Sequence, residues 1–182
     1  MGFWYSSLQD RTQSWYWTGI AIGTAQTIGL HRDPDSKRQN KSLSPAQRRL
    51  WKNIWWCCVY RDRWLAFGSG RPLRINAADC DMPFPDEDCM LLPRGSPLFS
   101  TRKLVPTELA QMSSLFLGLL RLAIVLGDIL TSIYQRGHQP LESGIIAPLA
   151  RRLASCVPDL LDDVDGTDLI RFYKMFTQLH VE

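Results

Sequence analysis

Carboxylates have the clearest chemical potential in this sequence, and they occur in two settings. The first setting is a cluster of five aspartates near the C-terminal end: Asp159, Asp162, Asp163, Asp165 and Asp168. The stretch 163–166 resembles the centre of a calcium loop, but Leu161 and Phe172 stand where the first and last ligands are required. A magnesium-binding DDxxD motif is also incomplete, because position 166 is glycine. We therefore expect an interhelical turn at this cluster.

The second setting is Asp62, which lies beside Arg63 in a tryptophan-rich stretch that we expect to be buried. A buried charge must be paired, and the nearby cations are Arg61, Arg63, Arg71 and Arg74. The glycines at 68 and 70 would turn the chain back toward this stretch. We therefore expect an ion pair between Asp62 and either Arg63 or Arg71. The alternative is a catalytic or effector-binding carboxylate.

Histidine and cysteine give no complete reactive or metal-binding set. The histidines His31, His138 and His180 are far apart, and no metal-ligand motif includes them. The cysteines are Cys57, Cys58, Cys80, Cys89 and Cys156, without a CxxC pair. We expect reduced thiols, with Cys57 and Cys58 buried, and a structural role for His31 beside a helix end. The sequence does not predict an enzyme.

Composition narrows the protein class. The chain has 182 residues, 45% of them hydrophobic and 21% charged, with a formal charge of +3, which excludes wholesale disorder. The longest apolar stretch, 115–130, contains Arg121 and Asp128 and is shorter than the about 20 residues of a membrane span. We therefore expect no membrane partner. Seven Lys or Arg lie between positions 32 and 52, a pattern that favours a solvated surface over a phosphate-binding patch.

Helical periodicity dominates the chain, with no convincing alternation of period two, so we expect an all-α fold. The first helix should cover about residues 10–30, with one line of contact formed by Trp15, Gly19, Ile22, Gln26 and Leu30. Gly19 and Gly23 would allow close helix contact. The second helix should begin at Ser44-Pro45, with Gln47 completing a capping box, and end at the glycines 68–70. Its expected buried line is Leu50, Ile54, Cys58 and Leu65, widened by Trp51, Trp55 and Val59.

The rest of the chain should hold a loop and further helices. Six prolines between positions 71 and 106 predict a long irregular segment. A third helix over about 107–135 has eight apolar residues at helical spacing: Leu109, Met112, Phe116, Leu119, Ala123, Leu126, Leu130 and Ile133. A fourth and a fifth helix are expected near 145–156 and 167–179.

Two blocks of residues resemble a known family. The first block contains Thr18-Gly19-Ile20-Ala21-Ile22 and then Gly29-Leu30-His31-Arg32. The second contains Trp55-Trp56, Asp62-Arg63 and Gly70-Arg71-Pro72. In this order, and over about residues 12–90, they resemble the fungal-specific transcription factor domain, which is the middle homology region of fungal zinc-cluster regulators.

The resemblance implies an irregular all-helical regulatory domain of a nuclear factor that controls RNA polymerase II transcription. It treats residues 1–182 as one domain fragment, incomplete at the N-terminus, with C-terminal helices over 107–180. Zinc and DNA would be bound only by a separate N-terminal zinc-cluster module, and this chain would hold no cofactor. The implied partners are other copies, transcriptional co-regulators and a small-molecule effector. The alternatives are a free-standing helical scaffold or dimerisation module, and a small helical enzyme that uses Asp62 or the carboxylates of 159–168.

Overall fold

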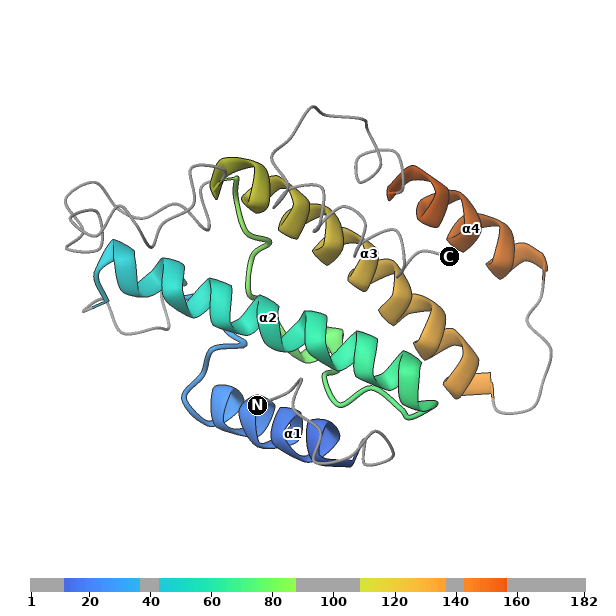
Figure 1. Cartoon of the computed structure of the whole chain (residues 1–182), viewed down its shortest axis with the longest axis horizontal. Helices are drawn as coiled ribbons and strands as arrows, with labels where there is room; N and C mark the ends of the chain where they lie inside the picture. The colour runs from blue at the N-terminus through green and yellow to red at the C-terminus, as the bar shows by residue number, and fades with distance from the viewer. Residues whose placement is uncertain (1–11, 37–42, 88–108, 137–142, 157–182) are drawn as a thin grey trace. The chain divides into compact units, whose positions relative to one another are not determined.

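The helical periodicity of the sequence is realised in the computed structural model, which describes residues 12–36, 43–87, 109–136 and 143–156 (Figure 1). These residues form four α-helices and one short 3₁₀ helix, and they contain no strand, so the all-α prediction is confirmed. The chain divides into two compact units. Unit 1 comprises Met1–Phe84 and Leu126–Gly137, and unit 2 comprises Pro85–Val125 and His138–Glu182.

Helix α1 (Thr12–Thr27) carries no charged residue, and a left-handed glycine follows its end. Gly29 has φ 84°, and the N–H groups of Gly29 and Leu30 donate to the carbonyls of Gln26 and Ala25 at 3.0 and 2.8 Å. Only glycine adopts this backbone conformation without a steric cost, and the two bonds satisfy carbonyls at the helix end. The helix therefore ends before Asp33-Pro34, where we expected it to stop.

The buried stripe of α1 differs from the predicted one. It consists of Ser14, Thr18, Ile22 and Ala25, whereas Gln26 is exposed and Trp15 and Gly19 are half-buried. The predicted line is therefore right for Ile22 and Leu30 and wrong for Gln26. Ser14 and Thr18 are buried in this stripe, whereas two arginines lie over the Trp15 ring.

Helix α2 (Pro45–Ser69) begins and ends as predicted. The Gln47 N–H donates to Ser44 Oγ at 3.3 Å, and the Ser44 N–H donates to Gln47 Oε1 at 2.8 Å, which completes the capping box. Pro45 occupies the first turn, where its missing N–H costs nothing. Gly70, with φ 60° and ψ 33°, caps the C-terminus.

Helix α2 is central to unit 1, but it buries only one face. That face holds Trp55, Cys58, Val59, Asp62, Arg63 and Ala66. The prediction was wrong for Leu50 and Ile54, which are 57% and 41% exposed, and for Cys57, which is also exposed. At 100° per residue, positions 50 and 57 fall on the side of the helix opposite Trp55, and position 54 falls at the edge of the buried face.

The core of unit 1 joins α1, α2 and the segment that follows α2. Helices α1 and α2 lie side by side and run in opposite directions (Figure 1). Residues 70–84, which we call the return segment, run back along α2 and contain the 3₁₀ helix η1 (Ala77–Asp79). The buried apolar cluster draws on all three parts: Ile22, Ala25, Leu30, Trp55, Cys58, Val59, Ile75 and Met82.

Helices α3 (Leu109–Arg136) and α4 (Ser143–Cys156) follow the predicted third and fourth positions. In α3 the buried side chains include Ser113, Leu117, Leu120, Leu122, Ala123, Val125 and Leu130. Ile133, the last residue of the predicted apolar line, is 43% exposed. The expected fifth helix, the aspartate cluster at 159–168 and the loop beyond position 87 lie outside the described residues.

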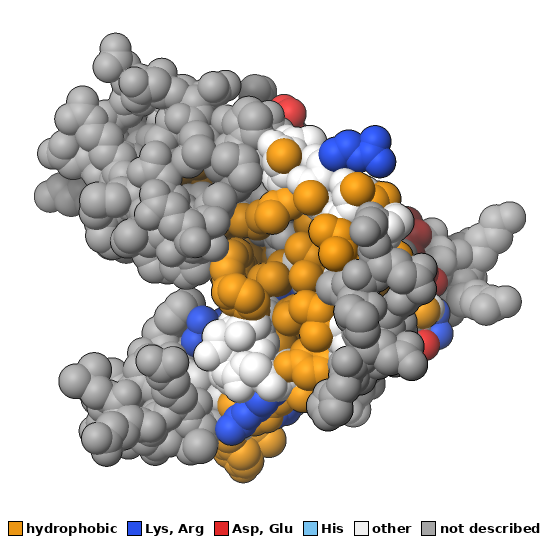
Figure 2. Space-filling view, turned by 90° about the vertical axis from the view of Figure 1, so that its right-hand side faces the viewer, with side chains coloured by type: hydrophobic (Ala, Val, Ile, Leu, Met, Phe, Trp, Pro, Cys, Tyr) orange, Lys and Arg blue, Asp and Glu red, His pale blue; other side chains and the backbone are white. Residues whose placement is uncertain are grey.

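One described helix is long and apolar enough, by length and composition, to cross a membrane, whereas we expected no such stretch. It covers residues 109–134 of α3, and 44% of its most apolar window is buried within the structure. The core helix of a soluble protein meets the same criterion. Elsewhere in the described residues, large apolar side chains also reach the surface. Among the residues that Figure 2 draws in colour, hydrophobic side chains are prominent on the face shown.

Candidate functional site

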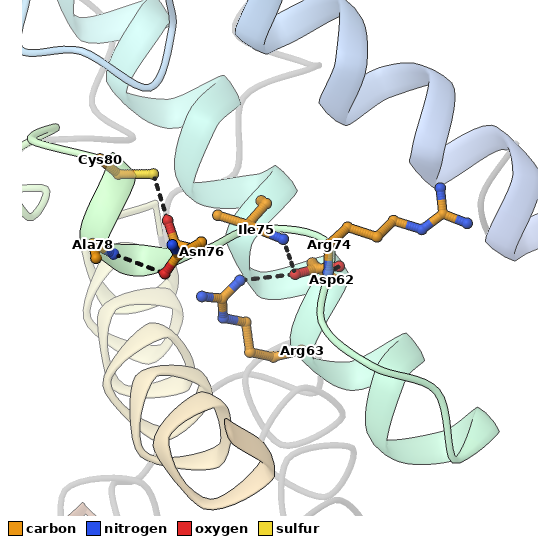
Figure 3. A network of polar contacts seen from close by, with 7 residues as sticks. All are labelled: Asp62, Arg63, Arg74, Ile75, Asn76, Ala78 and Cys80. Atoms are coloured by element: carbon orange, nitrogen blue, oxygen red, sulfur yellow. Dashed lines mark hydrogen bonds and ion pairs between the residues drawn. The ribbon is translucent and has the colours of Figure 1, made fainter. Parts of the chain in front are cut away.

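The side chain with the most unusual environment is Asp62, in the middle of α2. It is 1% exposed, and three N–H groups donate to its carboxylate (Figure 3). The Arg63 Nη1 donates to Oδ2 at 2.8 Å, and the backbone N–H groups of Arg74 and Ile75 donate to Oδ1 and Oδ2 at 3.1 Å each. The predicted pairing with Arg63 is confirmed. The carboxylate thus links α2 to the return segment.

Burial perturbs both members of this pair. Burial raises the pKa of Asp62, and the Ile75 N–H, the Arg63 charge and the Arg74 N–H oppose the rise. Burial lowers the pKa of Arg63, and the Asp62 charge is the largest opposing influence. The three hydrogen bonds that reach the carboxylate all come from N–H donors, which favour its ionised form, so the geometry fits the ionised carboxylate. The Asp62–Arg63 pair is therefore a buried, hydrogen-bonded ion pair.

The Arg63 guanidinium fills a space that a glycine of α3 leaves open. An added Cβ on Gly127 would stand 3.0 Å from Arg63 Nε, within unit 1. Nε itself is buried without a hydrogen-bond partner. The Cys80 thiol donates to the Asn76 carbonyl at 3.2 Å in the chain that follows α2. Burial raises the pKa of Cys80, and the Arg63 charge opposes that rise. Arg63 is thus packed as well as paired.

Two other arginines of the return segment meet α1 at one tryptophan. The guanidinium carbons of Arg74 and Arg71 lie 4.0 and 5.0 Å from the centroid of the Trp15 ring, within range of a cation–π interaction. The Arg74 side chain extends away from Asp62 toward α1 (Figure 3). An added Cβ on Gly19 would come within 1.7 Å of Arg74 Nη1. Gly19 therefore admits a guanidinium rather than a second helix, which corrects our expectation for the glycine pair.

The far end of the return segment is tied to the chain that follows α1. The Asp81 N–H donates to the His31 carbonyl at 3.2 Å, and the Asp33 N–H donates to Asp81 Oδ1 at 2.9 Å. Arg32 lies 3.6 Å from Asp81 in a half-exposed ion pair. The His31 ring contacts the Trp55 ring at 5.9 Å between centroids. These contacts hold the turn after α1 against both α2 and the return segment.

A tryptophan of α2 contacts the end of the return segment. The Trp56 Nε1 donates to the Pro83 carbonyl at 2.9 Å, and its ring meets Phe84 edge-on at 5.1 Å. Proline has no N–H of its own, but its carbonyl is a full acceptor. The indole N–H therefore fixes the exit of the return segment on α2.

Most residues of the two blocks identified in the sequence lie where α1, α2 and the return segment meet, and we call this region the junction. Asp62, Arg63, Trp55, Trp56, Leu30, His31, Arg32 and Arg71 all contribute side chains or backbone to it, and Gly29 and Gly70 supply the turns. Pro72 is exposed beside it. We did not anticipate the roles of Trp15, Gly19 and Arg74. Their only sequence signal is that two arginines follow a helix end while a glycine interrupts an otherwise suitable helix.

The basic segment between α1 and α2 shows one further internal pair. Arg48 pairs with Asp35 and also donates from Nε to the Leu43 carbonyl at 3.1 Å. Positions 37–42, which hold three of its seven cations, lie outside the described residues. Across the described parts of the chain, no three His, Cys, Asp or Glu side chains gather as metal ligands would. The hydrogen bonds of the Asp62 carboxylate join α2 to the return segment.

Comparison with known proteins places this junction in a family. Residues 1–164 match the family described as the fungal specific transcription factor domain. The chain belongs to this family. The junction residues fall within the matched region, so the internal contacts described above belong to a fungal transcription factor domain. No solved structure matches the chain significantly.

Three relatives are named as transcription factors or regulatory proteins. Cutinase transcription factor 1 beta of Fusarium vanettenii is 47% identical over 87 residues, covering 48% of this chain and 9% of that protein. A transcription factor of Fusarium pseudograminearum is 31% identical and covers 88% of this chain and 19% of its own length. The acetamidase regulatory protein of Aspergillus fumigatus is 34% identical over 82 residues, 43% of this chain and 10% of its own. The chain thus spans less than a fifth of each of these three relatives.

Proposed function

We propose that this chain is the regulatory and interaction domain of a nuclear fungal zinc-cluster transcription factor that controls RNA polymerase II transcription. Its relatives include cutinase and acetamidase regulators, which supports a role in transcriptional regulation. In this proposal, sequence reading and zinc binding belong to a separate DNA-binding module. The domain transmits its state through protein contacts, with a small-molecule effector as a further input.

The observation that carries the proposal is that the residues of the two family blocks, above all Asp62, make their contacts within the chain. Asp62, a buried carboxylate beside an arginine, has the surroundings of a reactive group, yet all three of its donors come from the chain's own framework. Catalytic groups must instead reach a reacting atom within hydrogen-bond distance. A core that fixes three segments against one another suits a domain that acts through contacts at its surface.

A tethered reporter tests this proposal. The full chain is fused to a DNA-binding domain of known target site and expressed in a fungal strain that carries a reporter behind that site. We expect reporter expression to differ from that with the DNA-binding domain alone. Asp62→Asn should reduce the difference by destabilising the fold, and Asp86→Asn, at an exposed position of the same chain, should preserve it. Equal expression from the fusion and the DNA-binding domain alone, at equal nuclear protein levels, would contradict the proposal.

A further inference from the structure

Helix α1 has an apolar side that faces solvent. Tyr16, Trp17 and Ile20 of this helix are 59%, 42% and 48% exposed, and Ile28, just beyond its end, is 56% exposed; we call these four residues the outer face of α1. Tyr16 and Ile20 lie opposite the buried stripe formed by Ser14, Thr18, Ile22 and Ala25, and Trp17 lies on its flank. A run of exposed large apolar side chains on one helix face is typical of an interaction site.

The outer face is accessible as well as apolar. The Tyr16 and Trp17 rings meet edge-on at 5.2 Å, which joins them into one surface. Gly23 lies one and two turns from Ile20 and Tyr16 on the same side, and an added Cβ there would meet nothing within 4 Å. A partner can therefore approach the α1 backbone closely at Gly23.

Positive charge borders this face, and its donors are available. Arg71 and Arg74 lie over Trp15, whose position adjoins that of Tyr16 on the helix surface. A cation–π contact uses the face of a guanidinium and leaves its in-plane N–H donors free for a carboxylate. In the described part of the chain, no ion pair involves either arginine, although Arg32, Arg48 and Arg63 each have a carboxylate partner.

We propose that the outer face of α1, together with Arg71 and Arg74, docks a partner peptide that combines acidic and large apolar side chains. The apolar side chains would cover the outer face, and the carboxylates would bind the two guanidiniums. Charge complementarity selects this partner over a second copy of the same surface. A second copy would bring two more guanidiniums, while α1 itself has no carboxylate to offer.

This inference rests on the proposed function for its biological setting, because it names the chemistry of a protein partner for the regulatory domain. Its physical basis is separate. Apolar burial supplies most of the affinity at such a surface, and the arginines supply orientation and specificity. Binding should therefore weaken both when the peptide loses its acids and when it loses its apolar side chains.

Fluorescence anisotropy with three synthetic peptides tests the peptide chemistry. The first peptide alternates Asp and Leu at helical spacing, the second replaces every Asp by Asn, and the third replaces every Leu by Ser. With the full chain, we expect the first peptide to bind about tenfold or more tightly than either of the others, which is about 1.4 kcal/mol. Equal affinity for all three peptides, or no binding by the first, would overturn the proposal.

Matched variants of the chain locate the surface. We expect Ile20→Ser to weaken binding of the first peptide about tenfold, whereas Ile146→Ser, equally exposed at 48% on α4, leaves it unchanged. Arg71→Gln should weaken binding, and Arg151→Gln on α4 should not. Ile20→Ser replaces a solvent-exposed side chain, and circular dichroism verifies its fold.

Two results would overturn the docking site on α1. If Ile20→Ser and Ile146→Ser bind equally well, the peptide binds elsewhere. If the chain self-associates in sedimentation, loses that association through Ile20→Ser and binds no peptide, the outer face is a contact between copies. Peptide binding that depends on Ile20, combined with a silent tethered reporter, would contradict the proposed function and leave the docking site standing.

Discussion

At the scale of single residues, burial decides what each polar or thiol group can do. Asp62 and Arg63 are both nearly inaccessible, and each is stable inside the unit because the other is present. A buried ion pair adds little net stability compared with apolar residues, but removing one partner leaves an uncompensated charge. Removal of Asp62 should therefore be destabilising mainly because the Arg63 charge would stay buried without a carboxylate partner.

The adjacent cysteines of α2 should differ in reactivity. Cys57 is exposed, whereas burial, followed by the charges of Cys57 and Asp62, raises the pKa of Cys58 from 9.0 to about 11. The thiolate is the reactive form, so at about pH 8 iodoacetamide should modify Cys57 and spare Cys58. Peptide mass spectrometry after timed alkylation measures this, and urea-unfolded protein, in which both thiols should react, is the control. Equal labelling in the native protein would contradict the burial of Cys58.

The same pKa shift has a consequence for stability. The folded state holds the Cys58 proton more tightly than the unfolded state, because its pKa is the higher of the two. This contribution is fully present below about pH 9, and it is lost as the pH rises toward 11. Urea unfolding of wild type and Cys58→Ala across this pH interval should show a steeper loss in the wild type. Parallel curves would exclude the contribution.

At the scale of elements, glycines set where the helices end. Gly70 occupies the left-handed region at φ 60°, whereas Gly68 lies inside α2 with no positive φ. Neither position lacks space, since an added Cβ at either would meet nothing within 4 Å. The two glycines therefore separate the cost of backbone conformation from the cost of crowding.

Alanine at these two positions should have opposite effects. Gly70→Ala should lower the free energy of unfolding by about 1–2 kcal/mol, because alanine resists the left-handed conformation. Gly68→Ala should raise it by about 0.5–1 kcal/mol, because alanine loses less entropy within a helix. Chemical denaturation of both variants measures the two shifts. The same sign for both would show that the Gly70 conformation does not control this turn.

Local signals predicted the elements well and the faces of the helices less well. Ser44, Pro45 and Gln47 fix the start of α2 through bonds within four residues, which a sequence reveals directly. The buried face is decided by contacts between distant segments. Ile54 is apolar and exposed, because the face of α2 that contacts α1 and the return segment is centred on Trp55.

The junction was predictable in part for the same reason. The Asp62–Arg63 pair could be inferred because a charge in an apolar helix needs a partner. The two backbone N–H donors from Arg74 and Ile75 depend on the path of the return segment, which no local pattern specifies. The packing of Arg74 against Trp15 and Gly19 likewise requires the three-dimensional arrangement.

At the scale of the whole molecule, the described structure has the features of a framework that displays surfaces. Three separate stretches of unit 1 share one core, and a buried carboxylate, a tryptophan N–H and two arginines join them. Several large apolar side chains remain outside. This combination accords with membership of a transcription factor family.

The purified chain should neither bind zinc stoichiometrically nor distinguish DNA sequences. Sequence readout requires side chains that reach base edges in a groove, and the proposal assigns that role to another module. Weak binding through the basic residues would fall steeply with salt and would be the same for all duplexes. Elemental analysis and titrations with several duplexes at about 0.15 M salt measure both properties. One zinc per chain, or a strong preference for one duplex, would contradict the assignment.

The link between Asp62 and the return segment is the central feature of this structure, and amide hydrogen exchange in Asp62→Asn tests it most directly. Asparagine keeps the shape but removes the charge that Arg63 and two N–H groups share. We expect much faster exchange at Arg74 and Ile75, and a loss of about 3–5 kcal/mol in the free energy of unfolding. Asp86→Asn, at an exposed position, should change neither quantity. Wild-type exchange rates at Arg74 and Ile75 in Asp62→Asn would show that this carboxylate does not hold the return segment to α2.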